Sequence, residues 1–215
     1  MPTNMKKIFV LLMVLLLPLL AKSETVEVNG IYYNLITKAN AAEIARNPEK
    51  YSGDIIIPLT IEYNGVEYSV DRIAVDAFIE SPNLQSVTIS DRIETIPEKC
   101  FYRCASLNNV FIGDGVKTIG ERAFENCNNL EEISIGKSVN AIESGAFEWC
   151  SNLKKVIIKD IWSWCHVNFA RYSSNPLFYA HHLFVDGEEV SDIDIPEGIE
   201  EIKDCAFQGC VSIKS

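Results

Sequence analysis

The most constraining feature of this 215-residue sequence is an internal repeat with a step of 23 residues. Leucine, isoleucine, phenylalanine and cysteine each return at that step through the middle of the chain. The recurring residues are Leu84, Leu107, Leu130 and Leu153; Ile96, Ile119 and Ile142; Phe78, Phe101, Phe124 and Phe147; and Cys104, Cys127 and Cys150. A fixed apolar pattern that recurs this often indicates an array of stacked units.

The spacing inside one unit predicts its local structure. Val87 and Ile89 flank the polar Thr88, and this alternation is typical of a half-buried strand. Val116 and Ile119 predict a turn or a second short extended piece, and the Ala123–Cys127 pattern predicts a short α or 3₁₀ segment. A unit of this size cannot bury its own apolar face, so we expect a β-rich solenoid in which equivalent strands pair side by side.

The repeat also suggests how the chain is divided. The expected coils lie near residues 54–83, 84–106, 107–129, 130–152, 153–189 and 190–212. The pattern is lost after residue 158 and returns at Val190, which places an insert at 159–189 in the fifth coil. Asn64-Gly65 lies between two alternating segments and predicts a hairpin inserted in the first coil.

Residues 24–53 are expected to cap the first coil, because a solenoid needs an atypical unit at its open end. Asn29-Gly30 between two apolar alternating segments predicts a β-hairpin here. Residues 39–46 suggest a short helix that ends before Pro48.

The first 23 residues have the pattern of a secretory signal peptide. Lys6 and Lys7 precede an apolar run at 8–20, and small residues follow at Ala21 and Ser23. The remaining 192 residues carry 16 basic and 30 acidic side chains, a net charge of −14. So acidic a chain is unsuited to nucleic acid or anionic lipid, and it contains no second membrane segment. We therefore expect an exported, soluble protein.

The pattern Val116-x-x-Ile119-Gly120-x-x-Ala123-Phe124-x-x-Cys127 resembles the BspA-like leucine-rich repeats. The resemblance covers residues 54–215 and extends to 24–53. It implies a right-handed leucine-rich repeat coil in a secreted or cell-surface protein. It also implies adhesion to extracellular-matrix proteins, host cells or other microbes, although many members of the family have no known role.

Seven cysteines in an exported chain suggest disulfides, but four of them occupy one inward-facing position of the repeat. Buried free thiols are the favoured interpretation, and bridges Cys100–Cys104 and Cys205–Cys210 are the alternative. Three histidines in the insert, His166, His181 and His182, lie near Cys165 without a standard zinc spacing. No catalytic motif is present, so we expect no enzyme activity, no metal and no cofactor.

The candidate site is a protein-binding face. Outward positions of the expected strands and exposed aromatic residues of the insert supply its residues, namely Thr88, Phe111, Ser134, Ile157, Trp162, Trp164 and Tyr172. Packing on the flank of the solenoid is the favoured interpretation of the aromatic residues of the insert, and an exposed aromatic patch for a ligand is the alternative. A structural spacer with no ligand of its own remains the alternative function.

The last residues read as the start of another coil, since Ile213 lies 23 residues after Val190. We therefore expect a fragment of a longer protein, with an uncapped end that exposes apolar side chains and an unpaired sheet edge. Such an end favours self-association.

Overall fold

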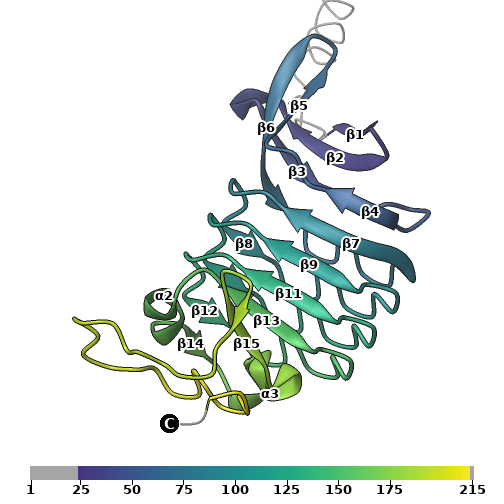
Figure 1. Ribbon diagram of the computed structural model, residues 1–215. Coiled ribbons are helices and arrows are strands. Elements are labelled where there is room, and N and C mark those ends of the chain that lie inside the picture. Colours follow the sequence, from purple (N-terminus) through teal and green to yellow (C-terminus); the bar gives the residue numbers. More distant parts are fainter. Residues whose placement is uncertain (1–23, 214–215) are drawn as a thin grey trace, which may run out of the picture.

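The 23-residue step appears in the structure as the register of parallel strands. The computed structural model describes residues 24–213. In it Val87 pairs with Val110, Val110 with Ile133, and Ile133 with Val156. These strands belong to a seven-stranded sheet in the order β16-β15-β13-β11-β9-β7-β4 (Figure 1). Its strands are β4 (Ser52–Ile56), β7 (Asn83–Ile89), β9 (Asn109–Ile112), β11 (Glu132–Ile135), β13 (Lys155–Ile158), β15 (Leu183–Val185) and β16 (Glu188–Glu189). The predicted β-rich solenoid is confirmed.

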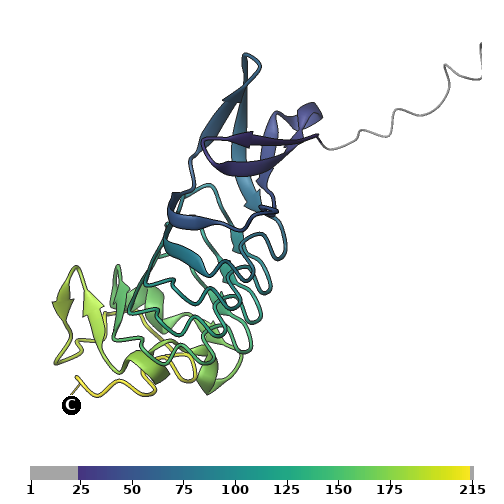
Figure 2. The same cartoon turned by 90° about the vertical axis from the view of Figure 1, so that its right-hand side faces the viewer.

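A second, shorter sheet forms another face of the solenoid. It consists of β8 (Thr95–Ile96), β10 (Thr118–Ile119), β12 (Ala141–Ile142) and β14 (Asn168–Phe169), all parallel. The extended alternative predicted for the Val116–Ile119 piece is thus confirmed. Figure 2 shows the connecting turns of successive coils stacked at regular intervals below the N-terminal sheet.

The third face consists of turns rather than the predicted helical segment. The N–H of Tyr102 donates to the carbonyl oxygen of Lys99, three residues earlier, at 3.1 Å. The N–H of Phe101 instead donates to the carbonyl oxygen of Ala123 in the next coil at 2.7 Å. Lys99 and Arg103 have positive φ values of 51° and 57°, which interrupt any helix. A helix would use its N–H groups within the segment. The observed alternation instead sends every second N–H to the neighbouring coil.

Aromatic rings stack through the core of the solenoid. Ring centroids lie 4.5 Å apart for Tyr51 and Phe78, and 4.9, 5.0 and 5.3 Å apart for the three successive pairs from Phe78 to Phe147. Phe101, Phe124 and the rest of the column are almost fully buried. The 23-residue phenylalanine repeat therefore acts as one continuous packing element.

The repeated cysteines lie beside this column as thiols. The Sγ atoms of Cys104, Cys127 and Cys150 donate to main-chain oxygens of the preceding coil at 3.1, 3.1 and 3.2 Å. Burial raises the pKa of the Cys104 thiol to about 12. All seven cysteines are unpaired, and only Cys205 and Cys210 are partly exposed.

Close approach of neighbouring coils requires glycine at one turn. A Cβ atom at Gly113 would lie 2.6 Å from Oδ1 of Asp91 and 2.7 Å from the carbonyl oxygen of Ile89. Because Gly113 has no Cβ atom, the Asp91 carboxylate can accept a hydrogen bond from the N–H of Asp114 at 2.7 Å. The glycine thus lets an acidic side chain of one coil bond to the backbone of the next.

The N-terminal residues form a five-stranded sheet in the order β1-β2-β3-β6-β5. Its elements are β1 (Glu24–Val28), β2 (Ile31–Ile36), the 3₁₀ turn η1 (Thr37–Ala39), β3 (Ala41–Ile44), β5 (Thr60–Tyr63) and β6 (Val66–Ile73). Both predicted hairpins are confirmed: Asn29-Gly30 and Asn64-Gly65 all have positive φ, as type I′ turns require. The second hairpin joins this sheet, although β4 before it already belongs to the solenoid.

The helix predicted at residues 39–46 is wrong. Residues Ala41–Ile44 instead form β3, which pairs antiparallel with β2 and parallel with β6. Ala42 and Ile44 are fully buried there. Two strand partners outweigh the weak helical preference of an alanine-rich segment.

The insert contains a complete coil of its own. Ile157 pairs with Phe184, so this coil has 27 residues, and short helices replace its turns. These are α2 (Ile161–Cys165), η2 (Tyr172–Ser174) and α3 (Leu177–Ala180). Asp160 caps α2 through a 2.7 Å bond from the N–H of Ser163.

The strand predicted for the sixth coil is therefore wrong. Residues 190–202 are described, and none of them lies in a strand. Only ten residues separate Leu183 from Ile193, too few to complete a coil, and the chain instead turns back at β16. Ile195 and Ile202 remain 43% and 42% exposed. The seven-stranded sheet ends in exposed Glu188 and Glu189, and a short charged strand of this kind discourages edge pairing.

One third-face carboxylate is poorly solvated. Oε2 of Glu125 is buried and makes no hydrogen bond in the described part of the chain, although Nε of Arg122 lies 3.3 Å away. Burial raises the pKa of Glu125 above its usual value. Ionisation of Glu125 is therefore less favourable in the folded state than in the unfolded chain.

Replacing Phe124 by alanine should lower the free energy of unfolding by about 3–5 kcal/mol, because a stacked core ring is lost. Denaturant midpoints of this variant and of Glu121→Ala, an exposed position, provide the measurement. Equal and small effects would contradict the inward orientation of the column.

Thiol titration should distinguish two classes of cysteine. Cys205 and Cys210 should react in the folded protein, whereas the five buried thiols should react only after unfolding in denaturant without reductant. A titration that finds a single thiol after unfolding would instead show three disulfides.

Glu125→Gln should stabilise the protein in a pH-dependent way. Since the folded-state pKa is raised, the folded protein binds the proton more tightly, and stability is lost as the pH rises through that pKa. We expect equal midpoints for both proteins in acid and a higher midpoint for the variant at neutral pH. The exposed Glu121→Gln variant is the control, and a Glu125→Gln protein that is less stable at neutral pH would contradict the assignment.

Candidate protein-binding face

Four of the predicted face residues form one row across the seven-stranded sheet. Thr88 pairs with Phe111, Phe111 with Ser134, and Ser134 with Ile157. All four side chains point outward, because their neighbours along each strand are the buried residues of the core. Phe111 is the most open of them, with 42% of its surface exposed.

The row is longer than the sequence analysis predicted. Ile56, 70% exposed, pairs with Thr88 at one end, and Phe184 pairs with Ile157 at the other. Phe184 was missed because the 23-residue step does not reach it. The apolar run Leu183-Phe184-Val185 before Asp186-Gly187, a hairpin signal, could have identified it. We call Ile56, Thr88, Phe111, Ser134, Ile157 and Phe184 the outer row.

Two lysines flank the outer row on β13 and its continuation. Nζ of Lys159 lies 5.8 Å from the ring centre of Phe111, and Nζ of Lys155 lies 5.5 Å from that of Phe184. Lys155 also lies 3.6 Å from the carboxylate of Glu132. These cation–π contacts place positive charge over an apolar surface in an otherwise acidic chain.

A hollow of about 210 Å³ opens beside this part of the row. Phe111, Ser134 and Ile157 line it from the sheet, and Lys159 and the Asp186-Gly187 turn line its rim. The hollow is large enough for one apolar side chain of a partner. Its lining is mostly apolar, with the hydroxyl of Ser134 on the sheet and the charged groups of Lys159 and Asp186 at the edge.

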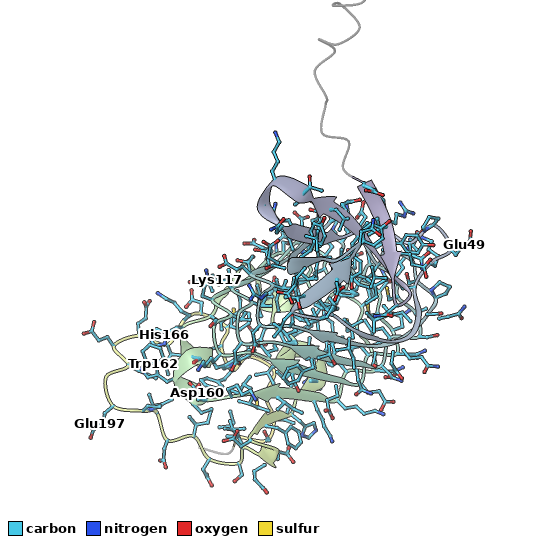
Figure 3. All side chains as sticks on the ribbon, turned by 90° about the horizontal axis from the view of Figure 1, so that it is seen from above. Glu49, Lys117, Asp160, Trp162, His166 and Glu197 are labelled. Carbon is cyan, nitrogen blue, oxygen red and sulfur yellow. The ribbon has the colours of Figure 1, made fainter. Side chains whose placement is uncertain are left out.

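The aromatic residues predicted in the insert do not join this face. Trp164 is only 2% exposed, and its Nε1 donates to the carbonyl oxygen of Ala206 at 2.7 Å, so it packs the insert and cannot contact a partner. Trp162 is exposed on α2, where its ring lies 4.1 Å from that of His166 (Figure 3). Tyr172 is exposed on η2 and contacts Phe178. Packing thus explains Trp164, while Trp162 and Tyr172 lie on other surfaces.

The three histidines make separate contacts. Nδ1 of His166 lies 2.7 Å from the carbonyl oxygen of Trp162. Nδ1 of His181 lies 2.9 Å from the carbonyl oxygen of Gly209. Nδ1 of His182 lies 2.6 Å from Oε1 of Glu189. Within residues 24–213, no group of three or more His, Cys, Asp or Glu side chains is placed to hold a metal ion. In the same range, no helix is long and apolar enough to cross a membrane. The predicted signal peptide lies outside the described residues.

Solved structures of bacterial leucine-rich repeat proteins resemble this fold. A leucine-rich repeat protein of Eubacterium ventriosum is 21% identical with a TM-score of 0.54, and the match covers 87% of this chain and 50% of that one. A leucine rich cell surface protein of Faecalibacterium prausnitzii is 22% identical with a TM-score of 0.48, covering 89% and 54%. The chain thus spans about half the length of these proteins. No curated protein matches it.

The family comparison agrees with the repeat and its register. Six copies of the BspA type leucine rich repeat region match residues 66–174 and 179–215. The matched residues contain the parallel strands β7 to β15, the stacked phenylalanines and the buried thiols. By both its sequence and its fold, this chain belongs to the BspA-type leucine-rich repeat family.

Proposed function

We propose that this chain is an exported, noncatalytic module that binds a protein partner through the outer row. The row itself carries the proposal, because it is a register-aligned set of exposed apolar side chains with a hollow beside it. Exposed patches of this kind on a soluble domain typically mark an interaction site. The signal-like first 23 residues and the family support display outside the cell.

The charges around the row suggest what the partner presents. An apolar side chain would enter the hollow beside Phe111 and Ile157. Carboxylates next to it would meet the ammonium groups of Lys155 and Lys159. We therefore propose a partner surface in which an apolar side chain is flanked by acidic groups, such as a site on an extracellular-matrix protein. Adhesion is the cellular role that such contacts would serve.

Phe111→Ala should weaken binding to purified extracellular-matrix proteins by about 2 kcal/mol, roughly 30-fold, if Phe111 is a central contact. Surface plasmon resonance against a panel of these proteins measures it. Val75→Ala removes an apolar side chain that is 64% exposed and lies outside the row, and it serves as the control. Lys159→Gln should mainly reduce the association rate and its dependence on salt. A panel with no binder, or equal affinities of the Phe111→Ala and Val75→Ala proteins, would contradict the proposal.

A further inference from the structure

A hollow of about 580 Å³ lies where the five-stranded sheet meets the first strand of the solenoid. Three consecutive residues of β4, Asp54, Ile55 and Ile56, line one side of it, and residues of β5 and of the β1–β2 hairpin line the rest. Side chains of a strand alternate between its two faces, so contact with three consecutive residues places the hollow along the edge of β4. Figure 1 shows β4 at the end of its sheet, next to the five-stranded sheet.

The backbone of β4 has open hydrogen-bonding groups along this edge. The N–H of Ile57 donates to the carbonyl oxygen of Thr88 in β7 at 2.9 Å. Successive residues of a parallel strand direct their N–H and carbonyl groups to opposite sides, so Ile55 and Ile57 bond to β7. The backbone groups of Asp54 and Ile56 then point away from β7, on the side of the hollow. Within the described chain, β7 is the only strand that pairs with β4, so these groups can pair with a further strand.

Apolar side chains surround the hollow. Val28, Ile31 and Pro58 line it from the neighbouring elements. Ile56 is 70% exposed, and Leu59 in the link between β4 and β5 is 52% exposed. The volume of about 580 Å³ falls in the range of pockets that hold a ligand. A strand paired with β4 would place every second side chain against this apolar surface.

The charged side chains of the lining, Asp54 and Glu62, are acidic. The Asp54 carboxylate accepts a hydrogen bond from the Ser86 hydroxyl at 2.6 Å. Glu67 lies directly opposite Glu62 in the β5–β6 ladder, and like charges in such a pair repel each other. Neither Glu62 nor Glu67 forms an ion pair within residues 24–213. A basic group of a ligand would relieve this repulsion, whereas a second copy of this acidic chain would increase it.

We propose that the edge of β4 binds an extended segment of another protein in which apolar and basic residues alternate. The segment adds a strand to the seven-stranded sheet through the backbone groups of Asp54 and Ile56. One set of its side chains contacts the apolar lining, and the other set brings basic groups near the carboxylates of Asp54 and Glu62. The site meets the outer row only at Ile56, and its occupancy does not depend on the protein binding proposed for that row.

The experiment measures binding of two labelled heptapeptides to the full chain by fluorescence anisotropy. One peptide alternates lysine with valine, and the other alternates glutamate with valine. We expect the lysine peptide to bind with a dissociation constant of about 100 μM and the glutamate peptide not to bind. Ile56→Pro removes one N–H at the edge and should bind the lysine peptide about fivefold more weakly than Ile56→Val, which keeps that N–H. Glu62→Gln should weaken binding about threefold, and Glu188→Gln, at an exposed position of β16, should leave it unchanged.

Amide hydrogen exchange, followed by NMR, locates the bound peptide. With the lysine peptide at ten times its dissociation constant, the N–H groups of Asp54 and Ile56 should exchange about tenfold more slowly. Four results would overturn the proposal: no binding of the lysine peptide, equal affinities of Ile56→Pro and Ile56→Val, equal losses from Glu62→Gln and Glu188→Gln, or no slowing at Asp54 and Ile56. Dimers that slow these two amides without peptide would also overturn it, because the occupant would then be a second copy. None of these outcomes bears on the outer row, whose test uses matrix proteins and Phe111.

Discussion

The structure depends on the close, regular approach of one coil to the next. Backbone hydrogen bonds join successive coils on all three faces: two through parallel sheets, and the third through turns such as that of Phe101 and Ala123. The Phe78–Phe147 rings stack at the same spacing inside. Strand pairing sets the coil separation, and the core side chains must then repeat with it. This is why the sequence repeat is so regular, and why Gly113 is required where Asp91 contacts the next coil.

The same constraint organises the surface. Because equivalent positions stack in register, outward residues form rows, and the character of each row depends on few substitutions. On the seven-stranded sheet the ammonium groups of two lysines lie over the rings of Phe111 and Phe184. This arrangement supports the proposed binding of a protein partner. On the turn face, one row changes from Arg103 and Asn126 to Trp149. A repeat scaffold thus separates stability, which lies in the inward positions, from recognition, which lies in the outward ones.

The coil that contains the insert differs from the regular coils in length. The 27-residue coil keeps β15 and β14 in their sheets but replaces turns by α2, η2 and α3. Asn175, fully buried, then donates to the carbonyl oxygens of Cys205 and Ala206 at 2.6 and 3.1 Å, and Trp164 bonds to Ala206 as well. Segment 203–211 is therefore held by side chains of the insert, whereas residues 190–202 form no strand.

The sequence by itself determined the solenoid, the strand positions of its regular coils, its inward column and four members of the outer row, because these depend on local periodicity alone. It also determined both Asn-Gly hairpins, since positive φ at two adjacent residues is a local requirement. Only the tertiary structure decided that residues 41–44 are a strand, because β2 and β6 supply their partners. It also decided that Trp164 is buried and that residues 193–195 do not join the sheet. Each of these features depends on which distant segment occupies a given sheet edge or core position. The spacing of residues along the sequence does not specify such long-range contacts.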